Sequence, residues 1–431
     1  MSKTFCPIPW IFQAARNNGD LRVCCQANVS KNKGLIKKDN GEPYNAGKGG
    51  LQESRNANLV REMRLELLSD RWPEECVRCK QEEESGLNSR RQYELSNWKL
   101  DINEIRSKTA SDGSIDTNEV PVLYYDLRFG NKCNLSCRMC GPSDSDSWYA
   151  DYNALTGKTY YEDTHGRVEI EKRKEKWVDK KSTYNWHESE IFWKELGENK
   201  ENIQHIYMAG GEPLLIEKHY DFLESCVEQG LSANIILEYN TNMTVLSQRV
   251  IKLWKHFKQV RVGASIDGFG KVFEFQRHPA RWDHTYKNLK KLDELEFPVI
   301  SWMACTVTVY NVMHLPEFMR WKVMESGFKR INGSKMKPII TYHMAHKPEH
   351  LNIRVFSEEQ KNRVKEHFSK YKDIFKQNFS EDHFKKSIAI LDSVEDYMMS
   401  QSYHEKFYGE FESFSSKLDR IRNQNSSLYL P

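Results

Sequence analysis

The sequence predicts an α/β fold built on an open, partial (β/α)6 barrel of the TIM type, with a small N-terminal module and a helical C-terminal extension. Strands and helices alternate from about residue 121 to residue 345, which is typical of parallel strands joined by crossover helices. Only six such units can be counted, too few to close an eight-fold barrel. The expected strands cover residues 124–129, 203–208, 235–239, 260–266, 299–309 and 338–343, and the expected helices cover 217–229, 247–257, 284–296 and 315–325.

Composition divides the chain into four parts. Residues 1–90 form a cysteine-rich N-terminal module, and residues 91–120 are polar and turn-rich, which predicts a linker. The barrel core is expected at 121–345, and residues 346–431 are expected to form helices that cover its open side. A charged stretch at 156–181 lacks clear apolar periodicity, so we expect a solvated insertion there, with a lid over the barrel mouth as the alternative.

The overall charge and the arrangement of the cysteines limit the classes of protein to which this chain can belong. The chain has 431 residues, 64 Lys and Arg against 61 Asp and Glu, and a formal net charge of +3. This near balance does not indicate nucleic acid as a partner. No apolar run reaches the roughly 18 residues of a membrane helix, and the first residues show no secretory segment. The ten cysteines are clustered, which suits metal binding in a reducing compartment, so we expect a cytoplasmic protein.

Three cysteines follow the first barrel strand with the spacing C-x3-C-x2-C: Cys133, Cys137 and Cys140. Their thiolates can converge on one metal centre. A structural zinc ion requires four protein ligands, so it would need a distant fourth residue. A four-iron cluster held by three cysteines instead keeps one iron open for another ligand.

This motif resembles the signature of the radical S-adenosylmethionine (SAM) enzymes, in which an apolar or aromatic residue, here Met139, precedes the last cysteine. The resemblance implies a [4Fe-4S] cluster whose unique iron is chelated by the amino and carboxylate groups of SAM. It also implies reductive cleavage of SAM to a 5′-deoxyadenosyl radical, which abstracts hydrogen from a substrate. An open partial barrel is the fold of this family.

A second motif, Gly210-Gly211-Glu212-Pro213, directly follows the second expected strand. Paired glycines allow a ligand to approach the backbone closely, and a carboxylate can pair with an ammonium group. In radical SAM enzymes the matching segment binds the amino group of SAM. Alone, this segment would be an ordinary turn. Together with the cysteine motif it favours a radical SAM core over a zinc loop.

Further residues at the ends of the third and fourth strands resemble family segments that line the SAM ribose and carboxylate: Asn242, Ser265 and Asp267. Capping or turn roles are the alternative for each of them. Arg277 is expected to form a surface ion pair, although it could reach the SAM carboxylate. Cys226 is expected to be a buried core thiol.

The N-terminal module resembles the auxiliary-cluster modules called SPASM and twitch. The resemblance rests on a C…G-x4-C opening and a later C-x2-C, formed here by Cys6, Gly19, Cys24, Cys76 and Cys79. It implies a second [4Fe-4S] cluster held by the four cysteines. A zinc ion on the same four thiolates is the alternative.

Two features of the module depart from the usual pattern. No further cysteine follows Cys79 before Cys133, which favours the twitch arrangement with one auxiliary cluster over the full SPASM arrangement with two. The module also precedes the barrel instead of following it. Cys24 and Cys25 are adjacent and point in opposite directions if the segment is extended, so only one of them is expected to be a ligand. We choose Cys24 because it completes the G-x4-C spacing.

We therefore expect a radical SAM enzyme that acts on an organic substrate by hydrogen abstraction, either as an oxidoreductase or as a peptide-modifying or protein-modifying enzyme. Dehydrogenation of a small-molecule alcohol by the same chemistry is one alternative. A non-catalytic metal-binding protein with the same fold is another. An electron donor such as flavodoxin or ferredoxin is an expected partner. No catalytic acid or base can be singled out.

Overall fold

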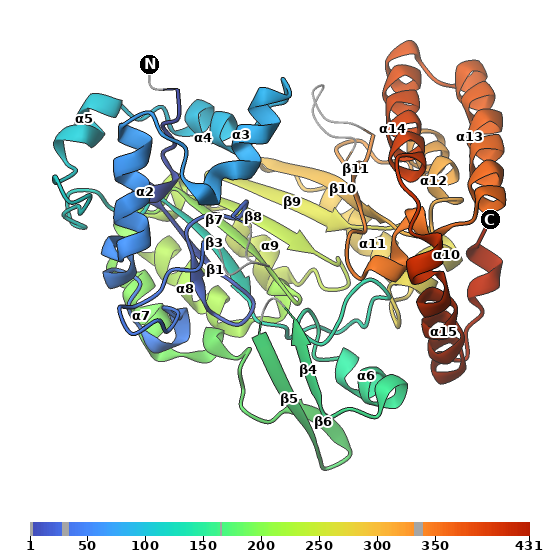
Figure 1. The fold of residues 1–431 in the computed structure, drawn as a ribbon, viewed down its shortest axis with the longest axis horizontal. Coiled ribbons are helices and arrows are strands. Elements are labelled where there is room, and N and C mark those ends of the chain that lie inside the picture. Colours follow the sequence, from blue (N-terminus) through green and yellow to red (C-terminus); the bar gives the residue numbers. More distant parts are fainter. Residues whose placement is uncertain (1–2, 28–33, 164–165, 332–338) are drawn as a thin grey trace.

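In this computed structural model, the described part of the chain comprises residues 3–27, 34–163, 166–331 and 339–431. Its centre is a curved eight-stranded sheet with the strand order β11-β10-β9-β8-β7-β3-β1-β2 (Figure 1). Strands β3 to β11 of this sheet pair in parallel. They are β3 (Tyr124–Phe129), β7 (His205–Gly210), β8 (Ile236–Thr241), β9 (Gln259–Ser265), β10 (Val299–Val307) and β11 (Thr341–Met344).

The predicted (β/α)6 partial barrel is confirmed by this order. Crossover helices follow the strands in sequence: α7 (Glu190–Glu198), α8 (Glu217–Glu228), α9 (Gln248–Trp254), α10 (Gly270–Gln276), α11 (Trp282–Asp293) and α12 (Leu315–Met324). The expected sixth strand began at residue 338, which lies outside the described residues. Apolar residues on alternate positions, such as Leu237 and Val260, are fully buried in the main core. This alternation lets each strand pack its apolar face against the helices.

The other face of the strands carries polar side chains into the barrel. The Glu238 carboxylate of β8 lies 3.2 Å from the Nε2 atom of His205 on β7 and 3.7 Å from the guanidinium of Arg261 on β9. Asn240 donates to the hydroxyl of Tyr207 at 2.6 Å. The barrel interior is therefore a hydrogen-bonded polar surface, as a binding site requires. The opposite face of the strands, which faces the helices, forms the core.

The N-terminal module is continuous with the barrel. Its strand β1 (Phe12–Ala15) pairs in parallel with β3, and β2 (Leu21–Arg22) continues the sheet in the antiparallel direction. Three helices belong to the same region: α1 (Ile8–Ile11), α2 (Asn58–Leu68) and α3 (Val77–Glu84). The module thus lengthens the central sheet by two strands, which the sequence did not predict.

The predicted linker contains two helices, α4 (Arg90–Trp98) and α5 (Ile102–Ser107). Ser89 and Gln92 form a capping box that starts α4. Arg91 and Glu94 of α4 are buried. The assignment of residues 91–120 as a linker stays a prediction, and Arg91 ties α4 to α3 through a 2.5 Å ion pair with Glu83.

The charged insertion is also ordered. After α6 (Trp148–Thr156) it forms a separate three-stranded antiparallel sheet of β4 (Tyr160–Asp163), β5 (Gly166–Arg173) and β6 (Lys176–Asp179). A small core of Tyr149, Val168, Ile170 and Tyr184 supports it. We missed these strands because the apolar side chains are few and most other positions are charged.

The C-terminal extension is helical as predicted, with α13 (Glu358–Asn378), α14 (Glu381–Met399) and α15 (His404–Arg422). Ser357 and Gln360 form the capping box of α13. Helix α13 packs on α12, whereas α15 packs on α6. Across the described residues, no helix combines the length and apolar composition needed to cross a bilayer.

Candidate cofactor and substrate sites

The three motif cysteines lie in one loop, residues 133–140, which we call the cysteine loop. It leaves the carboxyl end of β3 and borders a cavity of about 310 Å³ inside the barrel mouth, here called the core cavity. Side chains and backbone from the ends of β7, β8 and β9 complete this cavity. Its lining includes Cys133, Cys137, Met139, Cys140, Gly210, Gly211, Asn242, Ser265 and Arg277.

Backbone hydrogen bonds hold the cysteine loop on both sides. The amides of Ser136 and Arg138 donate to the carbonyls of His278 and Gln276, each at 2.8 Å. The Trp148 indole donates to the Cys137 carbonyl at 2.8 Å. The loop is therefore positioned by the segment after β9 and by α6, before any ligand binds.

The two glycines after β7 pack directly on the start of the cysteine loop. Gly210 has a φ of +120°, a region that favours glycine. A Cβ atom on Gly211 would lie 2.3 Å from the carbonyl oxygen of Lys132, so no larger residue fits without a shift. The Gly211 amide donates to the Gly130 carbonyl at 3.0 Å. This close approach brings the Gly210–Gly211 backbone to the wall of the core cavity.

Glu212 takes a different position from the one that the motif led us to expect. Its carboxylate is 1% exposed and accepts hydrogen bonds from the Thr241 hydroxyl at 2.8 Å, the Asn242 amide at 2.7 Å and the Leu214 amide at 3.1 Å. Burial raises the pKa of Glu212 to about 7. Glu212 is not among the described residues that line the core cavity. It holds the end of β8, and Pro213 behind it is buried in a short turn.

Asn242 and Ser265 do line the core cavity. The Asn242 side-chain amide lies 3.9 Å from the Cys133 sulfur and donates to the Asn134 side chain at 3.0 Å. Asp267 instead lies behind the cavity wall, where it is buried and accepts from the Thr306 amide at 2.7 Å.

Arg277 corrects our prediction of a surface ion pair. Its side chain is 7% exposed, forms a 2.7 Å ion pair with Asp267 and lines the core cavity. Its guanidinium lies 3.8 Å from the Cys137 sulfur. A hydrogen bond from Cys140 and the nearby Arg277 together lower the pKa of Cys137. The sequence spacing could not reveal this pair, because its burial depends on how the segments after β9 and α10 fold against the cysteine loop.

The four cysteines chosen for the N-terminal site line one further cavity, here called the N-terminal cavity. Cys6 precedes α1, Cys24 follows β2, and Cys76 and Cys79 belong to the turn before α3 and to α3 itself. Cys25 is not among the described residues that line it. Burial raises the pKa of Cys76 to about 12.

The chemistry of these donors suits iron–sulfur clusters at both sites. Each cavity gathers several thiols, and thiolates are the ligands that such clusters use. A cluster's iron ions would offset the cost of ionising thiols, such as Cys76 and Cys133, whose pKa burial raises. In residues 3–27, 34–163, 166–331 and 339–431, no three His, Cys, Asp or Glu side chains stand close enough to form a metal-holding group.

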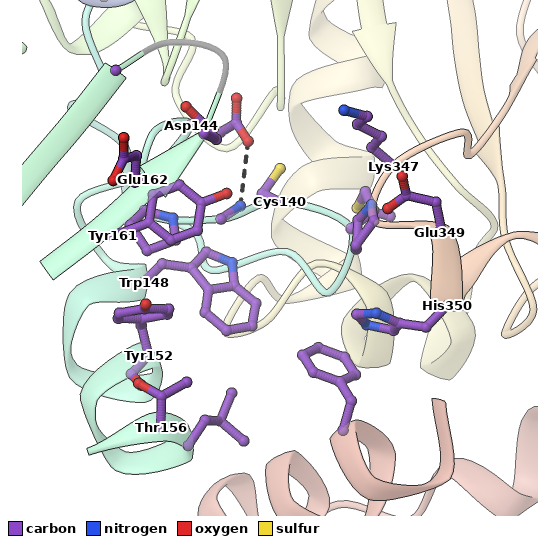
Figure 2. Close-up of a pocket in the computed structure, with 18 of the residues that line it drawn as sticks. Cys140, Asp144, Trp148, Tyr152, Thr156, Tyr161, Glu162, Lys347, Glu349 and His350 are labelled. Atoms are coloured by element: carbon purple, nitrogen blue, oxygen red, sulfur yellow. Dashed lines mark hydrogen bonds between the residues drawn. The ribbon is translucent and has the colours of Figure 1, made fainter. Parts of the chain in front are cut away.

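A third cavity, of about 1160 Å³, lies beside the cysteine loop and is called the large cavity below. Figure 2 shows residues of α6 and β4 on one side of it and Lys347, Glu349 and His350 on the other. It shares Met139, Cys140 and Asp144 with the core cavity. We did not predict it, since its walls come from the insertion, the N-terminal module and α15, which are distant in sequence.

Residues 127–324 match the model of the Radical SAM superfamily. The chain therefore contains a radical SAM domain, which runs from β3 to α12 and includes the cysteine loop and the two glycines.

Two solved structures are similar to part of this chain. The chain is similar to native anSMEcpe with bound AdoMet, with 15% identity and a TM-score of 0.37, over 59% of this chain and 63% of that one. It is similar to SuiB of Streptococcus suis bound to S-adenosylmethionine, with 13% identity and a TM-score of 0.36, over 80% of this chain and 67% of that one. The match thus spans less than two thirds of anSMEcpe. No curated protein sequence matches.

Proposed function

We propose that this chain is a radical SAM enzyme that modifies a peptide or protein by hydrogen abstraction. The observation that supports this most directly is the lining of the core cavity: three cysteines, two glycines and the polar residues Asn242 and Ser265 surround one space at the mouth of the barrel. We assign Cys133, Cys137 and Cys140 as ligands of a [4Fe-4S] cluster. When bound, that cluster supplies the electron for reductive cleavage of SAM.

The residues around this space then have distinct roles. The backbone of Gly210 and Gly211, which lines the core cavity, presents polar groups to the SAM amino group. Asn242 and Ser265 offer hydrogen bonds to the carboxylate and the ribose. Arg277 places a positive charge beside Cys137, which favours its thiolate form. Glu212 acts as a positioning residue for Asn242.

We further propose an auxiliary [4Fe-4S] cluster on Cys6, Cys24, Cys76 and Cys79. Their position around one cavity supports this assignment, and a zinc ion on the same ligands is the alternative that the iron analysis below distinguishes. A reduced flavodoxin or ferredoxin in the cytoplasm would supply electrons to the protein.

Peptide modification is favoured over oxidation of a small alcohol by the large cavity. Its volume of about 1160 Å³ exceeds the roughly 300–1,000 Å³ of typical small-molecule sites. It also adjoins Cys140 and Met139, so a substrate there would lie next to the core cavity.

Anaerobic purification and reconstitution test the proposal. We expect a brown protein with about eight irons, as two four-iron clusters imply. After reduction with dithionite it should convert SAM to 5′-deoxyadenosine, detected by liquid chromatography and mass spectrometry. A colourless, zinc-containing protein that leaves SAM intact would instead establish a non-catalytic metalloprotein.

A further inference from the structure

The large cavity is built by parts of the chain that lie outside the barrel strands. Trp148 and Tyr152 of α6 and Tyr161 of β4 lie on one side of it, and the turn at 347–350 lies on the other (Figure 2). Residues of α15, which packs on α6, complete the lining. Aromatic rings and charged groups alternate around it, which is the mixture that a peptide with both backbone and side-chain groups can use.

His350 is a buried polar group in this lining that has an unused hydrogen-bonding acceptor, whereas the unpaired buried atoms of Arg138 in the same lining can only donate. The residue is 7% exposed, and its Nδ1 lies 2.9 Å from a carboxylate oxygen of Glu410 on α15. Its Nε2 is buried and has no hydrogen-bond partner among the described residues. Buried polar atoms are nearly always paired, so an unpaired one requires an explanation.

The contact with Glu410 determines which atom is free. A carboxylate can only accept, so Nδ1 carries the hydrogen and Nε2 presents a lone pair. Burial lowers the pKa of His350, which keeps the ring neutral near pH 7. The Phe414 ring lies 4.7 Å from the imidazole, centre to centre, and also lines the cavity. Nε2 is therefore a hydrogen-bond acceptor on a residue that lines the cavity.

Other groups around the cavity are also available to a ligand. Glu162 of β4, Lys347 and Lys417 of α15 line it, and none of them forms an ion pair with the described residues. These groups carry charges of both signs, and Glu162 and Lys347 lie on different sides of the cavity (Figure 2). A small neutral alcohol would leave them unused, whereas a peptide segment carries enough polar groups to reach both walls.

We propose that the large cavity binds a peptide segment and that His350, oriented by Glu410, accepts a hydrogen bond from it. This inference rests on the proposed function, since it assigns the peptide substrate of the radical SAM domain to one cavity. It makes the insertion and α15, which both line the cavity, the elements that decide which peptides are accepted.

The probe is a pooled library of 12-residue peptides that each carry p-benzoylphenylalanine, cross-linked by light to the reconstituted full-length protein with SAM and no reductant. We expect the cross-links to map to residues 148–163, 347–350 and 410–417. Ser413→Trp, at an exposed position of α15 that lines the cavity, should lower the cross-linking yield at least about fivefold by filling the space. Ser416→Trp is the matched control, since Ser416 is exposed on the same helix outside the lining, and it should leave the yield unchanged.

A second pair of variants tests the role of His350, and this test does not require that the tryptophan variants fold correctly. His350→Gln keeps a side-chain acceptor, and His350→Phe removes it. We expect the phenylalanine variant to cross-link about fivefold less than the glutamine variant, the effect of one lost hydrogen bond of roughly 1 kcal/mol. Equal yields for these two variants would overturn the role of His350.

The cavity assignment has its own contrary outcomes. Peptide binding in this cavity would be overturned by equal yields for Ser413→Trp and Ser416→Trp, or by cross-links confined to other surfaces. It would also be overturned if the yield did not exceed that of a control library in which the position of the photoreactive residue is scrambled. A separate assay of 5′-deoxyadenosine without peptide tests the proposed function. Because cross-linking needs no turnover, a failure of the radical chemistry and a failure of the peptide site are distinguishable.

Discussion

Arg138, which lies between Cys137 and Met139 in the cysteine loop, forms an ion pair with Asp419 of α15. The two residues are 281 positions apart in the sequence. The Arg138 guanidinium also donates to the Gln424 side chain at 2.9 Å and lies 3.8 Å from the centre of the Phe275 ring. The C-terminal extension, outside the matched radical SAM domain, is therefore fastened directly to the loop that carries the three cysteines.

Asp419→Ala should weaken both the fold and the cysteine loop. Arg138 is fully buried, so removing its partner leaves an uncompensated charge, which costs about 3–5 kcal/mol in comparable buried pairs. Urea unfolding followed by circular dichroism measures the change in the free energy of unfolding. Asp392→Ala, which breaks the exposed pair with Lys372, is the control and should have little effect. Similar results for the two variants would show that the Arg138 pair does not brace the loop.

Cys137→Ala should abolish the core cluster and SAM cleavage, because two thiolates hold a four-iron cluster poorly. Iron content should fall by about half, and 5′-deoxyadenosine should disappear. Cys226→Ala, a change at a buried thiol of α8 outside both cysteine-lined cavities, should leave iron and product formation intact. Product formation by Cys137→Ala would disprove our assignment of the core site.

Glu212→Gln should keep the core cluster and lower the affinity for SAM about tenfold. The carboxylate accepts three hydrogen bonds, and an amide can replace only part of them, so the backbone at Asn242 loses its anchor. Isothermal titration of the reconstituted protein with SAM measures the affinity, and iron analysis controls for cluster loss. An unchanged affinity would leave Glu212 with a role in folding alone.

Lys322 gives the stability of the fold a pH dependence. It is buried in α12 and donates to the Ile339 carbonyl, and burial lowers its pKa to about 7. Between pH 7 and about 10.5 the unfolded chain binds this proton and the folded chain does not, so stability rises with pH over that window.

Lys322→Met should remove this dependence. The variant should gain stability relative to the wild type at pH 7, by an amount on the order of a few kcal/mol, and the difference should shrink toward pH 10. Urea unfolding of both proteins at several pH values measures it. Other titrating groups contribute equally to both proteins, so they cancel in the difference between their free energies of unfolding. If that difference stayed constant across the pH range, Lys322 would not be buried in its uncharged form.

Changing Cys76 and Cys79 together to Ala should empty the N-terminal site. Iron content should fall by about half, while the core still cleaves SAM without turning over substrate. Loss of the cluster should loosen α2 and α3, because the metal would close a long loop. Strand β1 should stay protected, since it pairs with β3 of the barrel. Hydrogen exchange with iron analysis checks both points, and unchanged iron with a protected α3 would exclude an auxiliary cluster.

Local patterns in the sequence predicted the barrel strands and the cysteine and glycine residues of the core cavity. The alternation of strands and helices predicted the six parallel strands, because apolar periodicity reflects which face of each element is buried. The spacing of Cys133, Cys137 and Cys140, and the paired glycines after the second strand, identified the residues that line the core cavity. These signals are readable because the residues of each motif are neighbours in the chain.

Only the tertiary structure decided the remaining features. Four of these features each join separate segments of the chain. They are the ion pairs Asp267–Arg277 and Arg138–Asp419, the hydrogen bonds that bury Glu212, and the contact of His350 with Glu410. Strand β1 of the N-terminal module and the sheet at 160–179 were missed for a related reason, since they are short or mostly charged. Burial and partner choice arise from packing between distant elements, and no local spacing records them.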